Sequence, residues 1–303
     1  MIDTTANLVI SKSNEVFLKI NTEPHIEYEL RDHFKFEVPN AKFMPQYRGR
    51  NWNGEIHLYD MRSKQIYVGL LDKIVQFCDN YGYSYKFEDN KFYGTPYEEN
   101  DHISYEGVKD YMHSICSHTP RKYQVEGVYG ALKHNRKLLI SPTASGKSLM
   151  IYSLVRYYVD RGEKILLVVP TTSLVEQMYK DFLDYGWDAD SYCHRIYSGR
   201  EKSNEAPVTI TTWQSVYKLE RSFFEDYGVI IGDEAHLFKS KSLIQIMTKL
   251  HHAKYRFGFT GTLDGTQTHK WVLEGLFRPS YKVTRTDELM RQGHLSQLDI
   301  QCL

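Results

Sequence analysis

The apolar residues of the chain follow two different patterns, and the change falls near residue 105. In the first part, short runs alternate apolar and polar residues, which is typical of half-buried strands. One run, Gly69–Tyr81, instead has apolar residues at helical spacing, and Gly82 follows it as a helix-ending residue. The pattern predicts a small α+β domain over residues 1–110. Its expected elements are strand segments within Asn7–Ile20, a helix at Pro24–His33, extended chain at Phe34–Val38, and hairpins that pair Glu55–Tyr59 with Gln65–Val68 and Tyr83–Phe87 with Lys91–Tyr93.

From about residue 105 the pattern changes to short apolar runs separated by amphipathic helical stretches. This alternation is typical of βα units and predicts an α/β domain with a parallel sheet over residues 111–285. In such sheets the loops that follow the strands lie along one edge, where ligands bind. The expected strands are Lys137–Ile140, Ile165–Val169, Val208–Thr211, Val229–Ile231 and Tyr255–Thr260, and the expected helices are Gln124–His134, Lys147–Asp160, Leu174–Tyr185, Gln214–Phe224 and Ser242–His251.

Composition narrows the class of protein only a little. The 303 residues include 38 Lys and Arg against 38 Asp and Glu, so only local charge can indicate a nucleic-acid partner. The four cysteines are scattered without a C-x-x-C pair, which indicates reduced thiols and no zinc site. The chain shows neither a signal-peptide pattern nor a long apolar run, so we expect a cytoplasmic protein without a membrane segment, in the host cytoplasm if it comes from a phage.

Residues 141–148 stand between the apolar run 138–140 and a helical stretch, which is the strand–loop–helix context of a phosphate-binding P-loop. Lys147 would reach the β- and γ-phosphates of ATP, and the Ser148 hydroxyl would help to hold Mg²⁺. Ser141 stands where the usual first glycine would be. A Ser-rich helix cap is the alternative interpretation. The residues predicted to bind the nucleotide here are Ser141, Pro142, Thr143, Ala144, Ser145, Gly146, Lys147 and Ser148.

A second motif places two adjacent carboxylates, Asp233 and Glu234, just after the expected strand Val229–Ile231. Asp233 would bind Mg²⁺, usually through water, and Glu234 would orient or deprotonate the attacking water. Taken alone, such a pair is also common at an ordinary helix N-terminus, which favours acidic residues. We expect the pair to lie on a strand next to that of the P-loop. The two motifs together then predict a Mg-ATP site with Lys147, Asp233 and Glu234 as its catalytic residues.

Six motifs in a fixed order, over about residues 115 to 290, resemble those of superfamily-two helicases and translocases with DEAH lettering; they are residues 120–124, 141–148, 169–177, 211–215, 233–236 and 259–263. The resemblance implies a RecA-like motor domain. Taken singly, residues 170–172 are also typical of a Thr-capped turn and residues 260–262 of a tight turn. The implied roles are adenine recognition by Arg121 and the Gln124 amide; contacts to one nucleic-acid strand by Pro170, Thr171, Thr172, Thr211 and Thr212; and coupling of the two sites by His236, Thr260, Gly261 and Thr262.

In the first domain, basic residues outnumber acidic ones between Lys42 and Lys64, with aromatic residues among them. Arg48, Arg50 and Trp52 are therefore candidate nucleic-acid contacts. A solvated loop anchored by Trp52 is the alternative. The whole chain also resembles the N-terminal part of the recombination helicases of T-even bacteriophages. That resemblance implies ATP-dependent remodelling of branched and forked DNA and of R-loops, including RNA–DNA hybrids, with the N-terminal domain on duplex DNA.

A motor of this class needs a second RecA-like domain with an arginine finger, and no Q-x-x-G-R-x-x-R-like stretch occurs before Leu303. We expect residues 286–303 to be a connector to that domain, with a helix within Arg285–Gln297 and a strand at Leu298–Leu303. The chain alone is then a monomer with weak ATPase activity. Two alternatives stay open: a duplex translocase or restriction-type motor subunit, and a nucleic-acid-binding module that uses ATP only as a switch.

Overall fold

The computed structural model describes residues 6–88, 100–142, 144–197, 205–239, 241–261, 267–291 and 293. The chain divides into two compact units, each built from two stretches of sequence. Unit 1 comprises Met1–Gly94 and Asp264–Pro279, and unit 2 comprises Thr95–Leu263 and Ser280–Leu303. The division differs from the expected ranges, because residues 264–279 belong with the N-terminal unit and not with the domain expected over 111–285.

Unit 1 is built on a four-stranded sheet with the order β5-β2-β1-β6 and a separate two-stranded sheet of β3 and β4. Strands β1, β2 and β5 pair antiparallel, and β6 pairs parallel with β1. The elements are β1 (Leu8–Lys12), β2 (Phe17–Thr22), α1 (Pro24–His33), β3 (Lys35–Glu37), η1 (Ala41–Phe43), α2 (Pro45–Arg48), β4 (Glu55–His57), β5 (Gln65–Tyr67), η2 (Val68–Leu70), α3 (Leu71–Tyr81), β6 (Tyr85–Phe87) and α11 (Gln267–Phe277). The predicted α+β class of this unit is confirmed.

The predicted hairpin between Glu55–Tyr59 and Gln65–Val68 is wrong. A turn does reverse the chain there, because the Asp60 carboxylate accepts hydrogen bonds from the Arg62 amide and the Ser63 hydroxyl. The pairing stops at a single bridge between Asp60 and Gln65. Beyond it β4 joins β3 and β5 joins β2, so the two strands end in different sheets. Strand β6 pairs with β1, and its expected partner at 91–93 lies outside the described residues.

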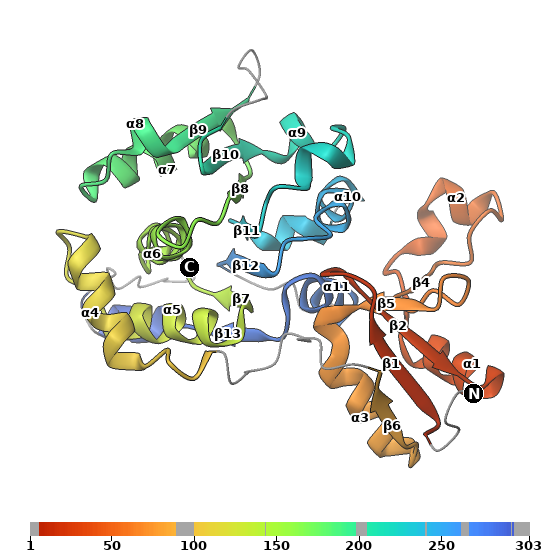
Figure 1. Ribbon diagram of the computed structural model, residues 1–303. Coiled ribbons are helices and arrows are strands. Elements are labelled where there is room, and N and C mark those ends of the chain that lie inside the picture. Colours follow the sequence, from red (N-terminus) through yellow and green to blue (C-terminus); the bar gives the residue numbers. More distant parts are fainter. Residues whose placement is uncertain are drawn as a thin grey trace, which may run out of the picture. The chain divides into compact units, whose positions relative to one another are not determined.

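Helix α11 completes the core of unit 1, although it follows residue 263 in the sequence. The Trp271 ring lies 5.0 Å from the Phe36 ring, and the Lys73 ammonium lies 4.6 Å from the centroid of the Trp271 ring. The Arg278 guanidinium, just after the helix, lies 2.9 Å from the Asp72 carboxylate. Figure 1 shows α11, coloured blue, among the red and orange elements of the N-terminal stretch. The chain therefore leaves unit 2 directly after the Thr260-Gly261-Thr262 segment and returns to it at β13.

Unit 2 contains a seven-stranded sheet with the order β13-β7-β12-β11-β8-β10-β9, and every pairing in it is parallel. Parallel pairing brings the carboxyl ends of its strands to one edge. Its elements are α4 (Tyr105–Ile115), α5 (Lys122–His134), β7 (Arg136–Ile140), α6 (Lys147–Val159), β8 (Ile165–Val169), α7 (Thr172–Asp184), α8 (Ala189–Tyr192), β9 (Cys193–Ile196), β10 (Val208–Thr212), α9 (Trp213–Val216), η4 (Arg221–Phe224), β11 (Val229–Gly232), η5 (Ala235–Lys239), α10 (Lys241–Lys249), β12 (Tyr255–Thr260), β13 (Ser280–Lys282) and α12 (Thr286–Arg291).

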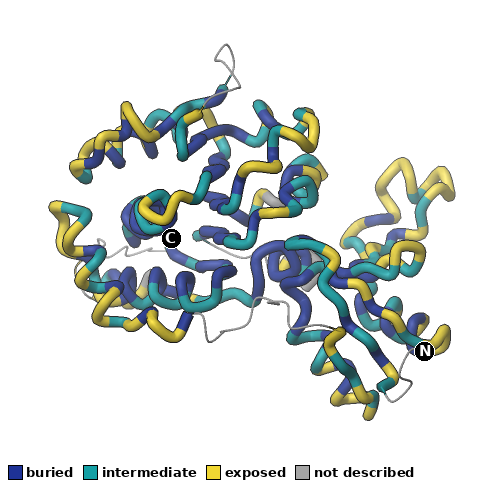
Figure 2. Tube along the Cα trace, viewed as in Figure 1, coloured by how far each residue is buried: buried dark blue, intermediate teal, exposed yellow. Residues whose placement is uncertain are grey.

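Both faces of this sheet are covered, which is why its strands are continuous apolar runs. Every residue of β8, β10 and β11 is buried. Alternate strand residues such as Leu167 and Ile231 belong to one core cluster with α5, α6 and α7. Figure 1 shows α6 on one side of the sheet and α10 on the other, and Figure 2 shows the strands as buried. The predicted RecA-like α/β class is confirmed.

Two local predictions for unit 2 need correction, and some of its elements were not predicted. The helix expected over Gln214–Phe224 is two short pieces, α9 and η4. Strands β9 and β13 and helix α4 were not predicted at all. Strand β12 separates β7 from β11, so the two motif strands are not direct neighbours. Of the connector expected after residue 285, the structure describes α12, and the strand expected at 298–303 lies outside the described residues. Within the described residues, no helix is long and apolar enough to span a membrane.

Candidate nucleotide and nucleic-acid sites

The loop after β7 is organised by two buried serines. The Ser141 amide donates to the Thr260 carbonyl at the end of β12, at 2.8 Å. The Ser141 and Ser145 hydroxyls lie 2.5 Å apart, and Ser145 donates in turn to the Pro142 carbonyl at 2.6 Å. Both side chains are fully buried. The serine in place of the usual first glycine therefore fixes the loop from inside, and neither hydroxyl points to solvent where a phosphate would lie.

Two residues of this loop adopt the left-handed backbone conformation, Ala144 with φ +63° and Gly146 with φ +76°. A Cβ atom at Gly146 would lie 2.3 Å from the Gln124 Nε2 atom, so any other residue would displace the Gln124 side chain and would also be strained by the positive φ. Helix α6 begins at the next residue, Lys147, and its first amides remain available to an anion. The predicted ligand Thr143 lies outside the described residues.

The segment predicted to read adenine is fastened to the P-loop. The Gln124 amide donates to the Ser145 and Gly146 carbonyls at 2.9 and 3.4 Å and accepts from the Arg121 amide at 2.8 Å. The Tyr123 hydroxyl donates to the Ser145 carbonyl at 3.0 Å and accepts from the Arg121 guanidinium at 2.8 Å. Sequence reasoning missed Tyr123. Because these contacts occupy the Gln124 amide, reading a base edge requires an exchange of hydrogen bonds.

Lys147 and Glu234 meet at the carboxyl edge of the sheet, although β12 lies between their strands. The Lys147 ammonium is 2.5 Å from the Glu234 Oε1 atom, and both side chains are only partly exposed. Each of them follows a strand of the same parallel sheet, and this shared edge brings them together. A γ-phosphate bound by Lys147 would therefore lie beside the Glu234 carboxylate, where an attacking water must be oriented.

Asp233 lies at the end of β11 and is buried. Burial raises the pKa of its carboxyl group, and the nearby Lys147 ammonium partly offsets this increase. Its Oδ1 atom accepts a hydrogen bond from the Glu234 amide at 2.9 Å. Glu234 itself has φ +49°, an uncommon backbone conformation for a residue other than glycine, and such conformations cluster at functional sites. A buried carboxylate with an incompletely compensated charge suits a divalent cation.

The hydroxyl of Ser148, the other predicted metal ligand, lies 2.7 Å from the Tyr185 hydroxyl. Tyr185 follows α7, and its ring packs edge-on against His118 at 5.6 Å. Sequence reasoning missed Tyr185 because it lies outside every motif. A hydroxyl oxygen that coordinates a metal keeps its proton, so Ser148 can hold a metal while its hydroxyl donates to Tyr185.

The structure brings the predicted coupling residues His236 and Thr260 together. The His236 Nδ1 atom lies 3.0 Å from the Thr260 hydroxyl and 3.4 Å from the Glu234 Oε2 atom. The Thr260 carbonyl also accepts from the Ser141 amide. Thr260 therefore contacts both halves of the nucleotide site. Gly261 follows it directly, and Thr262 lies outside the described residues.

Of the residues predicted to bind a nucleic-acid strand in unit 2, only one group is accessible. Thr171 caps α7 by accepting from the Leu174 amide, and Thr171 and Thr172 are exposed beside the half-buried Pro170. Thr211 and Thr212 are buried instead. The Thr211 hydroxyl donates to the Ile196 carbonyl at 2.9 Å, and that of Thr212 contacts Ser215 at 2.9 Å. These two threonines hold β10 against its surroundings, so their assignment as phosphate contacts is corrected.

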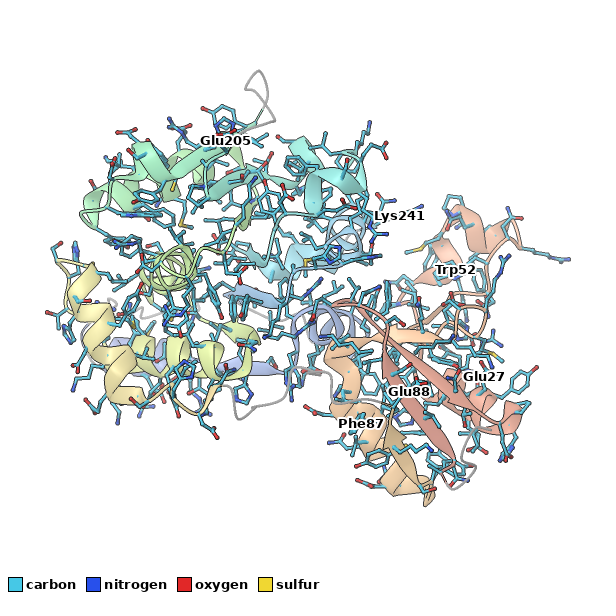
Figure 3. All side chains as sticks on the ribbon, viewed as in Figure 1. Glu27, Trp52, Phe87, Glu88, Glu205 and Lys241 are labelled. Carbon is cyan, nitrogen blue, oxygen red and sulfur yellow. The ribbon has the colours of Figure 1, made fainter. Side chains whose placement is uncertain are left out.

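In unit 1, Arg48 and Arg50 are exposed, whereas Trp52 is partly buried. The Trp52 Nε1 atom donates to the Glu55 carbonyl at 2.7 Å, and Figure 3 labels this side chain in the loop before β4. Trp52 is therefore the anchor of the loop, as the alternative interpretation had it. The exposed aromatic residue near these arginines is Phe43, which is 71% exposed and which sequence reasoning missed.

A P-loop and an acidic pair on one parallel-sheet edge, with His236 in contact with both Glu234 and Thr260, fit the motor domain of a superfamily-two helicase or translocase. Residues 117–265 match the family described as type III restriction enzyme, res subunit, and residues 11–88 match the N-terminal family of the DNA helicase UvsW. The crystal structure of the UvsW helicase from bacteriophage T4 superposes with a TM-score of 0.81 at 32% identity, over 91% of this chain and 99% of that one. The chain belongs to the UvsW family of DNA helicases.

Two relatives show how far the similarity extends. The ATP-dependent DNA helicase uvsW of Enterobacteria phage T4 is 32% identical over 297 residues, which cover 94% of this chain. The chain spans 58% of that helicase's length. The DNA 3'-5' translocase XPB2 of Sulfurisphaera tokodaii is 32% identical over 145 residues, which cover 47% of this chain and 30% of the translocase.

Proposed function

We propose that this chain is the DNA-contacting unit and first motor domain of an ATP-dependent helicase that remodels branched DNA and R-loops. The observation that carries the proposal is the approach of Lys147 to Glu234 at 2.5 Å on the sheet edge. It sets a phosphate-binding ammonium beside a carboxylate that can orient water, which is what ATP hydrolysis needs. Membership of the UvsW family supports DNA as the polymer on which the motor acts.

Each residue of the site has a defined task in this proposal. Lys147 exchanges Glu234 for the β- and γ-phosphates when ATP binds. Glu234 is then free to accept a hydrogen bond from the attacking water and to orient it in line with the bond that breaks. Ser148 and Asp233 would hold Mg²⁺, which supplies positive charge against the phosphate oxygens. When a base binds, Gln124 exchanges its hydrogen bond to the Ser145 carbonyl for one to the base. Tyr123 bonds to the same carbonyl, so base binding changes the contacts that hold the P-loop.

In this proposal the residues described above form one side of the nucleotide-binding cleft, and another domain must form the other side. We propose that a second RecA-like domain of the full-length protein supplies it, together with an arginine that stabilises the charge of the transition state. Such arginines contribute roughly three to five orders of magnitude to the rate in related NTPases. Hydrolysis by this chain alone is then slow, and movement along DNA follows from opening and closing of the cleft.

DNA contacts are proposed on both units. In unit 2 the exposed Thr171 and Thr172 at the N-terminus of α7 can bind phosphates of one strand. In unit 1 the exposed Arg48 and Arg50 can bind duplex phosphates. An open hollow of about 710 Å³ lies beside these arginines, and its lining residues are Lys42, Tyr47, Arg48, Arg50, Asn51, Trp52 and Asn53. Because Lys42, Arg48 and Arg50 line it, this hollow suits the polyanionic backbone of DNA.

Replacing both arginines, Arg48→Ala with Arg50→Ala, should weaken binding of duplex DNA by the full-length protein. Each lost phosphate contact removes about 0.9 from the slope of log affinity against log salt, so the slope should fall by about 2. Binding titrations between 50 and 200 mM salt measure it. Lys109→Ala with Arg221→Ala, two exposed cations outside the patch, is the matched control and should leave the slope unchanged. Identical slopes for the patch variant and the wild type would favour the solvated-loop interpretation.

Strand displacement tests the helicase proposal against the translocase alternative. The full-length protein should separate the strands of a fork or an R-loop in an ATP-dependent reaction. A duplex translocase would instead displace the third strand of a triplex and leave duplex strands paired. Triplex displacement without any strand separation would replace the helicase proposal by the translocase one.

A further inference from the structure

Residues 39–54 of unit 1, here called the arm, differ in charge from the rest of the chain. Between Glu37 and Glu55 there is no acidic residue, while Lys42, Arg48 and Arg50 are present. The arm contains η1 and α2 and connects β3 to β4. Figure 1 shows α2 extending beyond the small sheets of unit 1, and Figure 2 shows this stretch as largely exposed. The arm is thus a cationic projection that suits a polyanion.

The arm is a folded feature with its own internal contacts. The Val38 amide donates to the Gly54 carbonyl at 2.8 Å and closes its base. Gly54 is buried with φ +86°, and a Cβ atom there would lie 3.0 Å from the Ala41 Cβ atom, so the two ends of the arm pack tightly. At its outer end the Asn51 amide donates to the Gln46 carbonyl at 3.1 Å. These contacts fold the arm back on itself.

Despite this order, the arm exposes two large apolar side chains. Phe43 is 71% exposed, which is the highest value among the large apolar residues that the structure describes, and Met44 beside it is 40% exposed. They lie where η1 passes into α2, next to Lys42 and within the same arm as Arg48. Two adjacent exposed apolar side chains on a cationic projection suit a partner that is both apolar and negatively charged.

DNA offers such a partner only where base faces are uncovered. Within a continuous duplex every base face is stacked, whereas a branch point leaves unpaired bases and the end faces of base pairs accessible. Aromatic side chains stack on such faces, and apolar side chains inserted at base steps are an established way for proteins to engage DNA. The neighbouring cations would hold the phosphates on either side.

We propose that Phe43, supported by Met44, is a stacking wedge that contacts the uncovered bases at a DNA branch point. The wedge gives the protein its preference for branched over linear DNA, while Arg48 and Arg50 bind either form. This inference rests on the proposed function and adds the residue that recognises the branch. Trp52 anchors the arm, because its indole N–H donates to the Glu55 carbonyl.

The test compares binding of a three-way fork and a linear duplex with the same number of phosphates by the full-length protein. Phe43→Ala should lower fork affinity about tenfold and leave duplex affinity within twofold, because stacking on one base is lost. Phe43→Trp should keep the fork preference. Tyr28→Ala is the matched control, since Tyr28 is an aromatic side chain in the same unit that is 59% exposed and lies outside the arm. A 2-aminopurine base at the branch should report stacking by the wild type and by Phe43→Trp but not by Phe43→Ala.

Three results would contradict the proposal that Phe43 is a stacking wedge. One is a Phe43→Ala variant whose fork preference and 2-aminopurine signal match those of the wild type. Another is an equal loss on fork and duplex, which would make Phe43 a general contact. The third is a loss with Tyr28→Ala as large as that with Phe43→Ala. Failure of the proposed function looks different, because the wild type itself would then neither bind DNA nor hydrolyse ATP in response to it.

Discussion

Glu234→Gln in the full-length protein should lower the rate of ATP hydrolysis at least a hundredfold while ATP still binds. The amide keeps the shape of the side chain but cannot accept a proton from water, and general-base catalysis contributes roughly 10²- to 10⁴-fold. The structure adds a second expectation. Glu234 holds the Lys147 ammonium at 2.5 Å, so its neutralisation frees the lysine for phosphate and should tighten ATP binding by up to a few fold. Steady-state turnover and equilibrium nucleotide binding measure the two effects.

Two further variants make this result specific. Lys147→Ala should lose both binding and turnover, since the phosphates lose their cation. Glu225→Gln replaces a half-exposed carboxylate elsewhere in unit 2 and should leave both quantities within twofold of the wild type. The motor interpretation fails if neither Lys147→Ala nor Glu234→Gln changes turnover. A Glu234→Gln variant that no longer binds ATP would show that the ion pair organises the site and does not compete with phosphate.

Gly69→Ala should destabilise unit 1 by about 3 kcal/mol and lower its melting temperature by roughly 10 °C or more. A Cβ atom at this position would lie 2.1 Å from the Glu274 carbonyl oxygen and 2.6 Å from that of Gly275, both in α11. These are backbone atoms, so no side-chain rotation relieves the clash and the helix itself must move. Hydrogen exchange should show loss of protection in α3 and α11 together, and calorimetry measures the shift.

Gly130→Ala is the control for the same chemical change. Gly130 lies within α5, and a Cβ atom there meets no atom within 4 Å. Alanine in a helix is favoured over glycine by about 1 kcal/mol, so this variant should be slightly stabilised. If Gly69→Ala unfolds at the wild-type temperature with full protection of α11, the contact between α11 and η2 is not part of the core of unit 1.

Sequence reasoning worked best where a local signal and a buried pattern coincide. The strand before the P-loop, the strand before Asp233 and helix α6 are all continuous apolar or amphipathic runs bounded by distinctive residues. It failed where partners are chosen at long range. Nothing between Glu55 and Val68 indicates that the strands on either side of a good turn join different sheets. No local signal places α11 in unit 1, because its apolar residues would suit a helix of either unit.

At the site, sequence reasoning gave residue types correctly but not their surroundings. It could not tell that the Thr211 hydroxyl is buried against the Ile196 carbonyl, since threonine is common both in strands and at phosphate contacts. It selected Trp52 because this residue lies among the basic residues of the patch, whereas exposure depends on which ring the turn buries. The Tyr185 contact to Ser148 had no motif to indicate it. A signal for Phe43 did exist, in the acid-free stretch that contains it.

The most direct measurement of the central claim is ATP hydrolysis by the full-length protein with single-stranded, linear duplex, forked and R-loop substrates of matched length. An ATP-dependent motor for branched DNA predicts slow hydrolysis without nucleic acid and at least a tenfold higher rate with a fork or an R-loop than with the linear duplex. A rate that is the same with and without every substrate would contradict the account, because the nucleotide site would then not be coupled to DNA.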